Sequence, residues 1–168
     1  MSVTYTELPG LLTAIEAAGH WIVHKGGVFM TDDDAAVQAI ITSYDPLIYV
    51  QQQQLAAAAN EKWLHMAAGH TTASAGIPLA TDPQSLALIT SLYNAAQVNP
   101  NGTFSFKDRA GNFQALTSAQ VSTLYQDMAN WVQSFFTYEH TLVDQIKAAT
   151  SWQMALAIDV TAGWPANS

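Results

Sequence analysis

The chain has 168 residues, of which 49% are hydrophobic and 11% are charged, and 13 acidic against 5 basic side chains give a formal net charge of −8. This length suits one domain or two small ones, and the negative charge argues against nucleic-acid phosphates or an anionic membrane as the main partner. The absence of cysteine excludes disulfides, thiolate metal sites and cysteine nucleophiles. A charged fraction this low is typical either of a protein that stays bound to another protein or of a monomer with an uncharged polar surface.

No targeting or membrane segment is expected from the sequence. The N-terminal segment "MSVTYTELPG" has neither a basic region nor an apolar run, so we predict no signal peptide. No apolar stretch approaches the roughly 18 residues that a membrane helix needs.

The first 47 residues predict a small unit of helix, β-hairpin and helix. Apolar residues recur at steps of three and four in the first helix, which ends at Gly19. Two strand-like segments, 21–24 and 28–30, flank a Lys-Gly-Gly turn, because glycine tolerates positive φ. A unit of this size has little core of its own, so we expect it to pack on another part of the chain.

A helix is also predicted within residues 31–46. Thr31 or Asp32 is the expected cap, and three consecutive acids stand in the first turn, where the helix dipole favours them. Pro46 marks the end of this helix. Its buried face is predicted to hold Val37, Ile40, Ile41 and Tyr44.

A connecting helix is predicted over residues 48–68. Its four glutamines and four alanines form a low-complexity run, and both residue types are good helix formers. A flexible linker that orders only in an assembly is the alternative. Residues 69–168 then form a C-terminal helical domain with an aromatic β-hairpin. The pattern predicts a mainly α, α+β fold, in which a long helix of about 118–148 packs with shorter helices and two small hairpins.

The C-terminal domain contains several clear element boundaries. Asp82 followed by proline predicts the start of one helix, and Thr117 or Ser118 predicts the cap of the long helix. Between them, aromatic and polar residues alternate around a turn at residues 108–112, which indicates a hairpin. The candidates for one packed face of that hairpin are Phe104, Phe106 and Phe113.

Glu139 lies on the apolar stripe of the long helix, four residues after Phe135 and three before Leu142. A buried carboxylate must be paired, hydrogen-bonded or neutral. Catalysis needs a second acid, a histidine or a metal on the same face, and none stands there at helical spacing. A structural role needs only a donor, for which Lys107 and Arg109 are candidates. We therefore interpret Glu139 as a structural buried acid and predict no catalytic residue and no enzyme, with a carbohydrate-active or lytic enzyme as the alternative class.

No metal or cofactor site is predicted. His20 and His24 stand four residues apart in a strand, which separates them by roughly 13 Å at about 3.3 Å per residue. His65 and His70 show no metal-binding spacing. The acids at 32–34 lack the spaced oxygens of a calcium loop, and their place at a helix start explains them.

The residues predicted to contact a partner are apolar residues of the two hairpins and one tryptophan of the irregular tail. Trp164 either folds back as an anchor or meets a partner, and we prefer fold-back because an untied terminus frays. For every one of these residues a place in the core is the alternative. The predicted contact residues are Trp21, Ile22, Val28, Phe29, Phe104, Phe106, Phe113 and Trp164.

The second half of the chain carries a family resemblance. Its pieces are "LATDPQSLALITSLYNAA", the stretch from "GTFSFKDRAGNFQALT" through the long helix with Phe135 and Glu139, and the closing "GWP" at 163–165. Over roughly residues 56–165 the chain resembles a domain of unknown function carried by tail proteins of tailed phages and prophages, often beside tail-fibre and tail-fibre-assembly genes. Residues 33–47, "DDAAVQAIITSYDPL", resemble a second short segment of small phage tail proteins.

The resemblance implies a bacteriophage tail-fibre-associated protein, an assembly chaperone that binds the fibre and either leaves or stays in the virion. A permanent structural adaptor of the baseplate or tail fibre is the alternative. The implied partner is a trimeric tail-fibre protein or a baseplate component, with no nucleic acid, membrane or small-molecule substrate. The implied location is the host cytoplasm during assembly and, for a retained protein, the virion tail. No functional residues carry over from the family.

Overall fold

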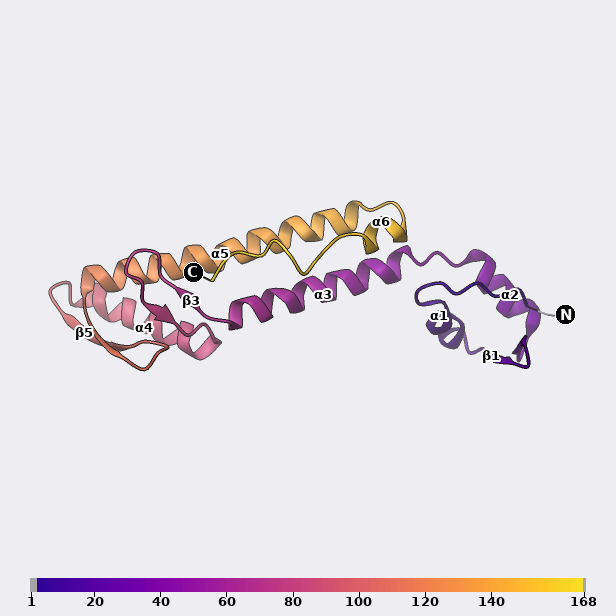
Figure 1. Cartoon of the computed structure of the whole chain (residues 1–168), viewed down its shortest axis with the longest axis horizontal. Helices are drawn as coiled ribbons and strands as arrows, with labels where there is room; N and C mark the ends of the chain where they lie inside the picture. Colours follow the sequence, from indigo (N-terminus) through magenta and orange to yellow (C-terminus); the bar gives the residue numbers. More distant parts are fainter. Residues whose placement is uncertain (1–2, 168) are drawn as a thin grey trace. The chain divides into compact units, whose positions relative to one another are not determined.

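A computed structural model describes residues 3–167 (Figure 1). These residues form six helices and three two-stranded antiparallel sheets, which confirms the mainly helical α+β class. No helix among them is long and apolar enough to cross a membrane. In chain order the elements are α1 (Leu11–Ala17), β1 (Ile22–Lys25), β2 (Val28–Thr31), α2 (Asp34–Ser43), α3 (Leu47–Ala67), β3 (His70–Thr71), β4 (Pro78–Leu79), α4 (Pro83–Val98), β5 (Thr103–Lys107), β6 (Phe113–Thr117), α5 (Ser118–Ala148) and α6 (Trp152–Leu156).

The described residues fall into two compact units. The first unit comprises residues 3–56 and 145–159, and the second comprises residues 57–144 and 160–167. The three-part division of the chain at residues 47 and 68 stays a prediction.

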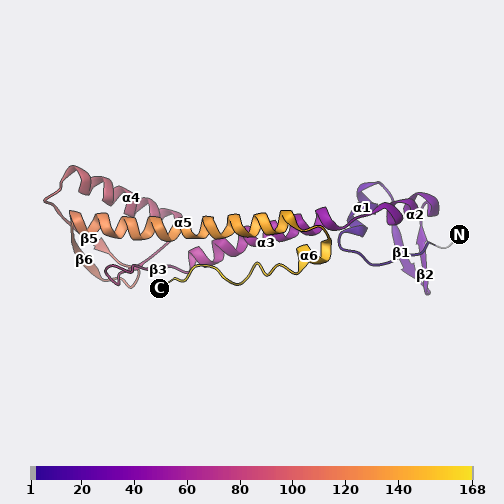
Figure 2. The same ribbon diagram turned by 90° about the horizontal axis from the view of Figure 1, so that it is seen from above.

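The hairpin of β1 and β2 is visible in the first unit in Figure 2. Its two-residue turn consists of Gly26 and Gly27, with φ of +61° and +80°. Positive φ at both central positions defines a type I′ turn, whose twist matches that of the flanking strands. Lys25 therefore ends the first strand, and the turn is one residue shorter than predicted.

Helix α2 begins later than predicted. Asp33 is its N-cap and accepts two backbone N–H groups at 3.0 Å each. Thr31 and Asp32 were the expected caps, and both are wrong. The Thr31 hydroxyl instead donates to the carboxylate of Asp34 at 2.7 Å, while Asp32 bonds to the residues that precede β1.

Two small cores stabilise the first unit. In one, the predicted inner face of α2 packs against α1 and the N-terminal segment. Its buried members are Val3, Leu11, Ile15 and Val37, with Ile22, Ile40, Ile41 and Tyr44 among the partly buried side chains around them. In the other, the start of α3 packs against α6, and its buried members are Val50, Ala149 and Ala155.

The glutamine run lies inside α3, which is one uninterrupted helix, as predicted. Gln51 donates from Nε2 to the carbonyl of Ile146 at 3.0 Å, and Gln54 donates to that of Ala155 at 3.1 Å. These carbonyls belong to the last turns of α5 and α6, where no intrahelical donor remains. Two of the four glutamines therefore cap the ends of two other helices.

The second unit contains the caps that the sequence predicts. Asp82 accepts the N–H of Ser85 at 3.0 Å at the start of α4. Thr117 and Gln120 form a reciprocal capping box for α5: Thr117 Oγ1 accepts the N–H of Gln120 at 3.3 Å, and Gln120 Oε1 accepts the N–H of Thr117 at 2.9 Å.

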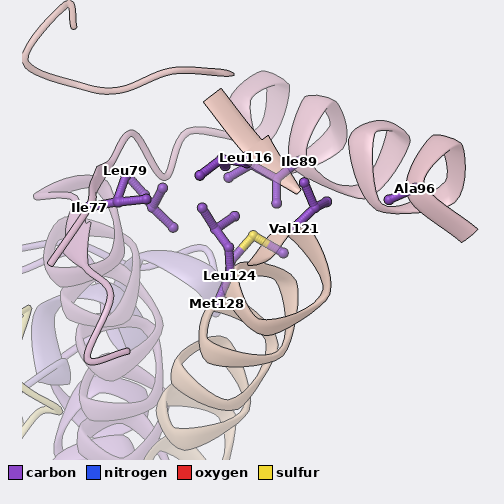
Figure 3. Packing of buried hydrophobic residues seen from close by; sticks show 8 residues of the cluster. All are labelled: Ile77, Leu79, Ile89, Ala96, Leu116, Val121, Leu124 and Met128. Atoms are coloured by element: carbon purple, nitrogen blue, oxygen red, sulfur yellow. The ribbon is translucent and has the colours of Figure 1, made fainter. Parts of the chain in front are cut away.

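The core of the second unit lies between α4, α5 and β6. Figure 3 shows its side chains pointing toward one another, with the sulfur of Met128 at the lower edge and Ala96 to one side. The members from α5 are the first part of the predicted stripe. The buried members are Ile77, Leu79, Ile89, Ala96, Leu116, Val121, Leu124 and Met128.

The sheet of β3 and β4 was not predicted as a pair. Pro78 and Leu79 pair with Thr71 and His70. Strands of two residues are too short to show the alternation from which a strand is predicted.

The packed face of the β5–β6 hairpin differs from the predicted one. Phe104 lies opposite Leu116, and Phe106 lies opposite Gln114. Opposite residues share a face, so this face continues at alternate positions of β6 and does not include Phe113. Phe113 is 74% exposed on the other face, opposite Lys107. The prediction that it packs with Phe104 and Phe106 is wrong.

Candidate interaction surface

Glu139 is paired with Lys62 of α3. The Lys62 Nζ lies 2.8 Å from Glu139 Oε2, and the two side chains keep only 9% and 20% of their exposure. The same ammonium lies 4.5 Å from the ring centroid of Phe136 and 5.4 Å from that of Trp63. Ion pairing and cation–π contact together offset the cost of burying the lysine charge.

The predicted partners of Glu139 bond elsewhere. Arg109 donates to the carbonyl of Ala68, and the Lys107 ammonium lies 5.8 Å from the ring of Phe113. Their assignment to Glu139 is therefore wrong. The true partner stands in α3, far away in sequence, where nothing in the local pattern indicated it.

The charged groups near the histidines form pairs rather than larger clusters. His20 Nδ1 lies 2.9 Å from Asp32, and the pKa of Asp32 is lowered first by the backbone N–H of Trp21 and then by His20. His140 lies 3.5 Å from Asp144 on an exposed part of α5. Among residues 3–167, no group of three or more histidine or acidic residues is placed to hold a metal ion.

One face of the β1–β2 hairpin is exposed and, apart from Lys25, apolar. Val23 lies opposite Met30, and Val28 lies opposite Lys25, so these side chains share a face. Val23 and Val28 are each 50% exposed, Met30 is 49% exposed and Trp21, just before β1, is 46% exposed. We call Trp21, Val23, Val28 and Met30 the hairpin patch. The sheet has two strands, so each strand has an outer edge that no strand of the described chain covers.

The opposite face of this hairpin is covered. Ile22 packs against the core of the first unit, and the Phe29 ring lies 4.7 Å from the rings of both Tyr5 and His24. Of the four contact residues predicted here, Trp21 and Val28 are thus in the hairpin patch, while Ile22 and Phe29 help to hold the fold. Sequence reasoning missed Val23 and Met30, although strand alternation from Trp21 and Val28 points to both.

The other predicted contact residues also separate by burial. Phe104 and Phe106 pack against the core of the second unit, whereas Phe113 is exposed. Trp164 folds back, as expected, and is 9% exposed. Its ring stacks 6.0 Å from Phe135 and meets Tyr138 edge-on at 4.9 Å.

One family model matches residues 49–162, and the family is described as Domain of unknown function (DUF4376). The chain belongs to this family. The DUF4376 match runs from α3 to just beyond α6 and includes the Lys62–Glu139 pair. The hairpin patch lies before the match, and Trp164 lies after it. Comparison with curated proteins and with solved structures gives no match.

Proposed function

We propose that this protein is a bacteriophage tail-fibre-associated protein, an assembly chaperone that binds the fibre through the hairpin patch. The observation that carries the proposal is the patch itself, in which Trp21, just before β1, and three apolar side chains of the two-stranded sheet are each about half exposed. Large exposed apolar groups that gather on one face are typical of surfaces that bind another protein. The resemblance of residues 33–47 and 56–165 to phage tail proteins supplies the class of partner.

The physical basis of the proposed activity is protection of an incomplete fibre. A trimeric fibre exposes strand edges and apolar surface before its chains close, and such surfaces aggregate. A hairpin with an apolar face can pack on that surface, and its outer edges can add a strand to an open sheet. The net charge of −8 favours a soluble complex during this stage.

A permanent adaptor of the baseplate or fibre is the second candidate. The division into two compact units favours it, because each unit presents a surface of its own and two surfaces can join two components. The adaptor and the chaperone both require binding to a tail protein. They differ in whether the protein remains after assembly.

Coexpression with the tail-fibre protein of the phage that encodes this chain tests the proposal. We expect the two proteins to copurify, and the double variant Val23→Ser/Met30→Ser to reduce the recovered complex at least about tenfold, as expected for loss of apolar anchors. Val98→Ser is the matched control, since Val98 is 87% exposed at the end of α4, outside the patch. A folded double variant that binds as well as the control contradicts the proposal.

Quantitative mass spectrometry of purified virions then separates the two candidates. Copies in fixed stoichiometry support the permanent adaptor or a retained chaperone. Absence from virions, combined with copurification during assembly, supports a chaperone that leaves.

A further inference from the structure

The segment that follows α6 is held to the second unit through its backbone carbonyls. We call residues 160–167 the strap; Figure 1 draws most of it as an irregular trace in the yellow end of the colour scale. Tyr138 donates its hydroxyl to the carbonyl of Ala162 at 2.7 Å. The indole N–H of Trp131 donates to the backbone carbonyl of Ala166 at 3.1 Å. The backbone N–H of Thr71 donates to the backbone carbonyl of Asn167 at 2.8 Å.

A single aromatic side chain anchors the strap. Trp164 inserts among Phe135 and Tyr138 of α5 and His65 of α3, whose ring lies 5.9 Å away. Its own indole N–H donates to the carbonyl of Val160 at 2.9 Å, so the buried N–H of Trp164 is satisfied within the strap. We call His65, Trp131, Phe135 and Tyr138 the strap groove.

The strap and its groove have the features of a bound peptide and its receptor. The strap has no helix or strand of its own. Two side-chain donors of the groove, on Trp131 and Tyr138, and the backbone N–H of Thr71 bind three of its carbonyls. Main-chain hydrogen bonds combined with one side-chain pocket are the usual means by which proteins bind extended peptides. The strap also begins at Val160, where the chain passes from the first compact unit to the second.

We propose that the strap groove is a peptide-binding site that accepts the strap of a second copy of this chain, so that two copies exchange straps. The structure identifies the occupant, because residues 160–167 are the peptide that the groove holds. A second copy presents the same peptide and makes the same hydrogen bonds and ring contacts between chains. Exchange of an identical element is a low-cost route to a dimer for this reason. The inference is independent of the tail-fibre assignment.

Two complementary full-length variants test the exchange. Trp164→Ala removes the strap anchor and keeps the groove, whereas Tyr138→Glu places a charge in the groove and keeps the strap. We expect each variant alone to be monomeric in sedimentation-velocity analysis. An equimolar mixture is expected to form a two-chain species, in which the intact strap of one variant occupies the intact groove of the other.

Two results overturn the inference. One is a mixture that stays monomeric while both variants keep the wild-type helical circular dichroism. The other is a Trp164→Ala variant that forms no mixed complex but binds the tail-fibre protein more tightly than wild type, since the groove then serves the fibre. In that second case the proposed function survives.

Hydrogen exchange of the unaltered chain decides the matter if either variant fails to fold. The Thr71 N–H is protected by the strap, whereas the Phe135 N–H lies inside α5. Strap exchange requires local opening, so the Thr71 amide must exchange at least about tenfold faster than the Phe135 amide. Equal rates overturn the inference, because the strap then opens only when the unit unfolds.

Discussion

The ammonium of Lys62 lies 2.8 Å from the carboxylate of Glu139 and 4.5 Å from the ring of Phe136, and the lysine side chain is only 9% exposed. The Glu139 carboxylate on the apolar stripe of α5 is therefore compensated by a cation. A buried charge without such a partner is strongly destabilising. This pairing supports the structural interpretation of Glu139 and leads to the first prediction.

Glu139→Gln leaves the Lys62 charge buried without its counter-ion. We expect it to lower the free energy of unfolding by about 3 kcal/mol, the low end for a broken buried pair because the carboxylate keeps some exposure. Urea denaturation measures the change. Asp144→Asn, which breaks the exposed pair with His140 on the same helix, is the control and should cost at most about 0.5 kcal/mol. A stable Glu139→Gln variant that loses turnover on a cell-wall substrate contradicts this account and favours the enzyme class.

The glutamine run gives a second prediction, in which Gln54 is tested and the neighbouring Gln53 is the control. Gln54→Ala removes the amide that donates to Ala155 O and should destabilise the protein by about 1 kcal/mol. Gln53→Ala changes an exposed residue of the same helix and should stay within about 0.5 kcal/mol. Thermal unfolding of both variants checks the difference. An equal loss of stability in the two variants would mean that Gln54 does not cap α6 in solution.

Gly163 and Gly76 both have positive φ, at +83° and +63°, but differ in their surroundings. A Cβ on Gly163 would collide with the Tyr138 hydroxyl, whereas a Cβ on Gly76 would have no neighbour within 4 Å. Gly76→Ala should therefore cost about 1 kcal/mol from backbone strain, and Gly163→Ala should cost about 2 kcal/mol or more. Chemical denaturation gives both values. Adding Tyr138→Phe to Gly163→Ala should recover part of the loss, and the absence of any recovery would argue against the collision.

His70 gives a prediction for pH dependence. Burial lowers its pKa, while a hydrogen bond to the Asn167 backbone and the charge of Asp127 act in the opposite direction. Because the pKa is lower in the folded chain than the ordinary value of about 6.5, the unfolded chain binds more protons in this range. The stability that depends on neutral His70 is complete above about pH 6.5 and is lost as pH falls through the folded pKa.

The His70→Gln variant tests that sign. Between about pH 7.5 and about pH 5.5, it should lose less stability than wild type, because it has no imidazole to protonate. His140→Gln is the control, since the His140 side chain is 76% exposed, and it should follow wild type. Urea midpoints at the two pH values give the comparison. If the stability of His70→Gln depends on pH as strongly as that of wild type, the prediction is contradicted.

The sequence was sufficient where structure follows from local signals. The apolar stripe of the long helix predicted over about 118–148 led to α5, and Asp82 followed by proline predicted the start of α4. The alanine and glutamine run predicted α3 through intrinsic propensity alone. These features depend on residues within a few positions of one another, so tertiary contacts did not alter them.

Features that depend on register or on distant segments could not be predicted in the same way. The face of Phe113 depends on which residues of β5 and β6 pair, and a shift by one residue moves a side chain to the other face. The partner of Glu139 comes from α3, 77 positions away. Val23 and Met30 were recoverable in principle, because alternation places them beside Val28 once the Gly26–Gly27 turn is fixed.

The most direct test of the proposed function is the number of tail fibres on virions assembled without this protein, counted by electron microscopy. Deletion of its gene from the phage should yield particles that lack fibres, and expression of the wild-type chain from a plasmid should restore them. Both the chaperone and the permanent adaptor predict this outcome. Particles with a normal number of fibres and normal infectivity would contradict the account.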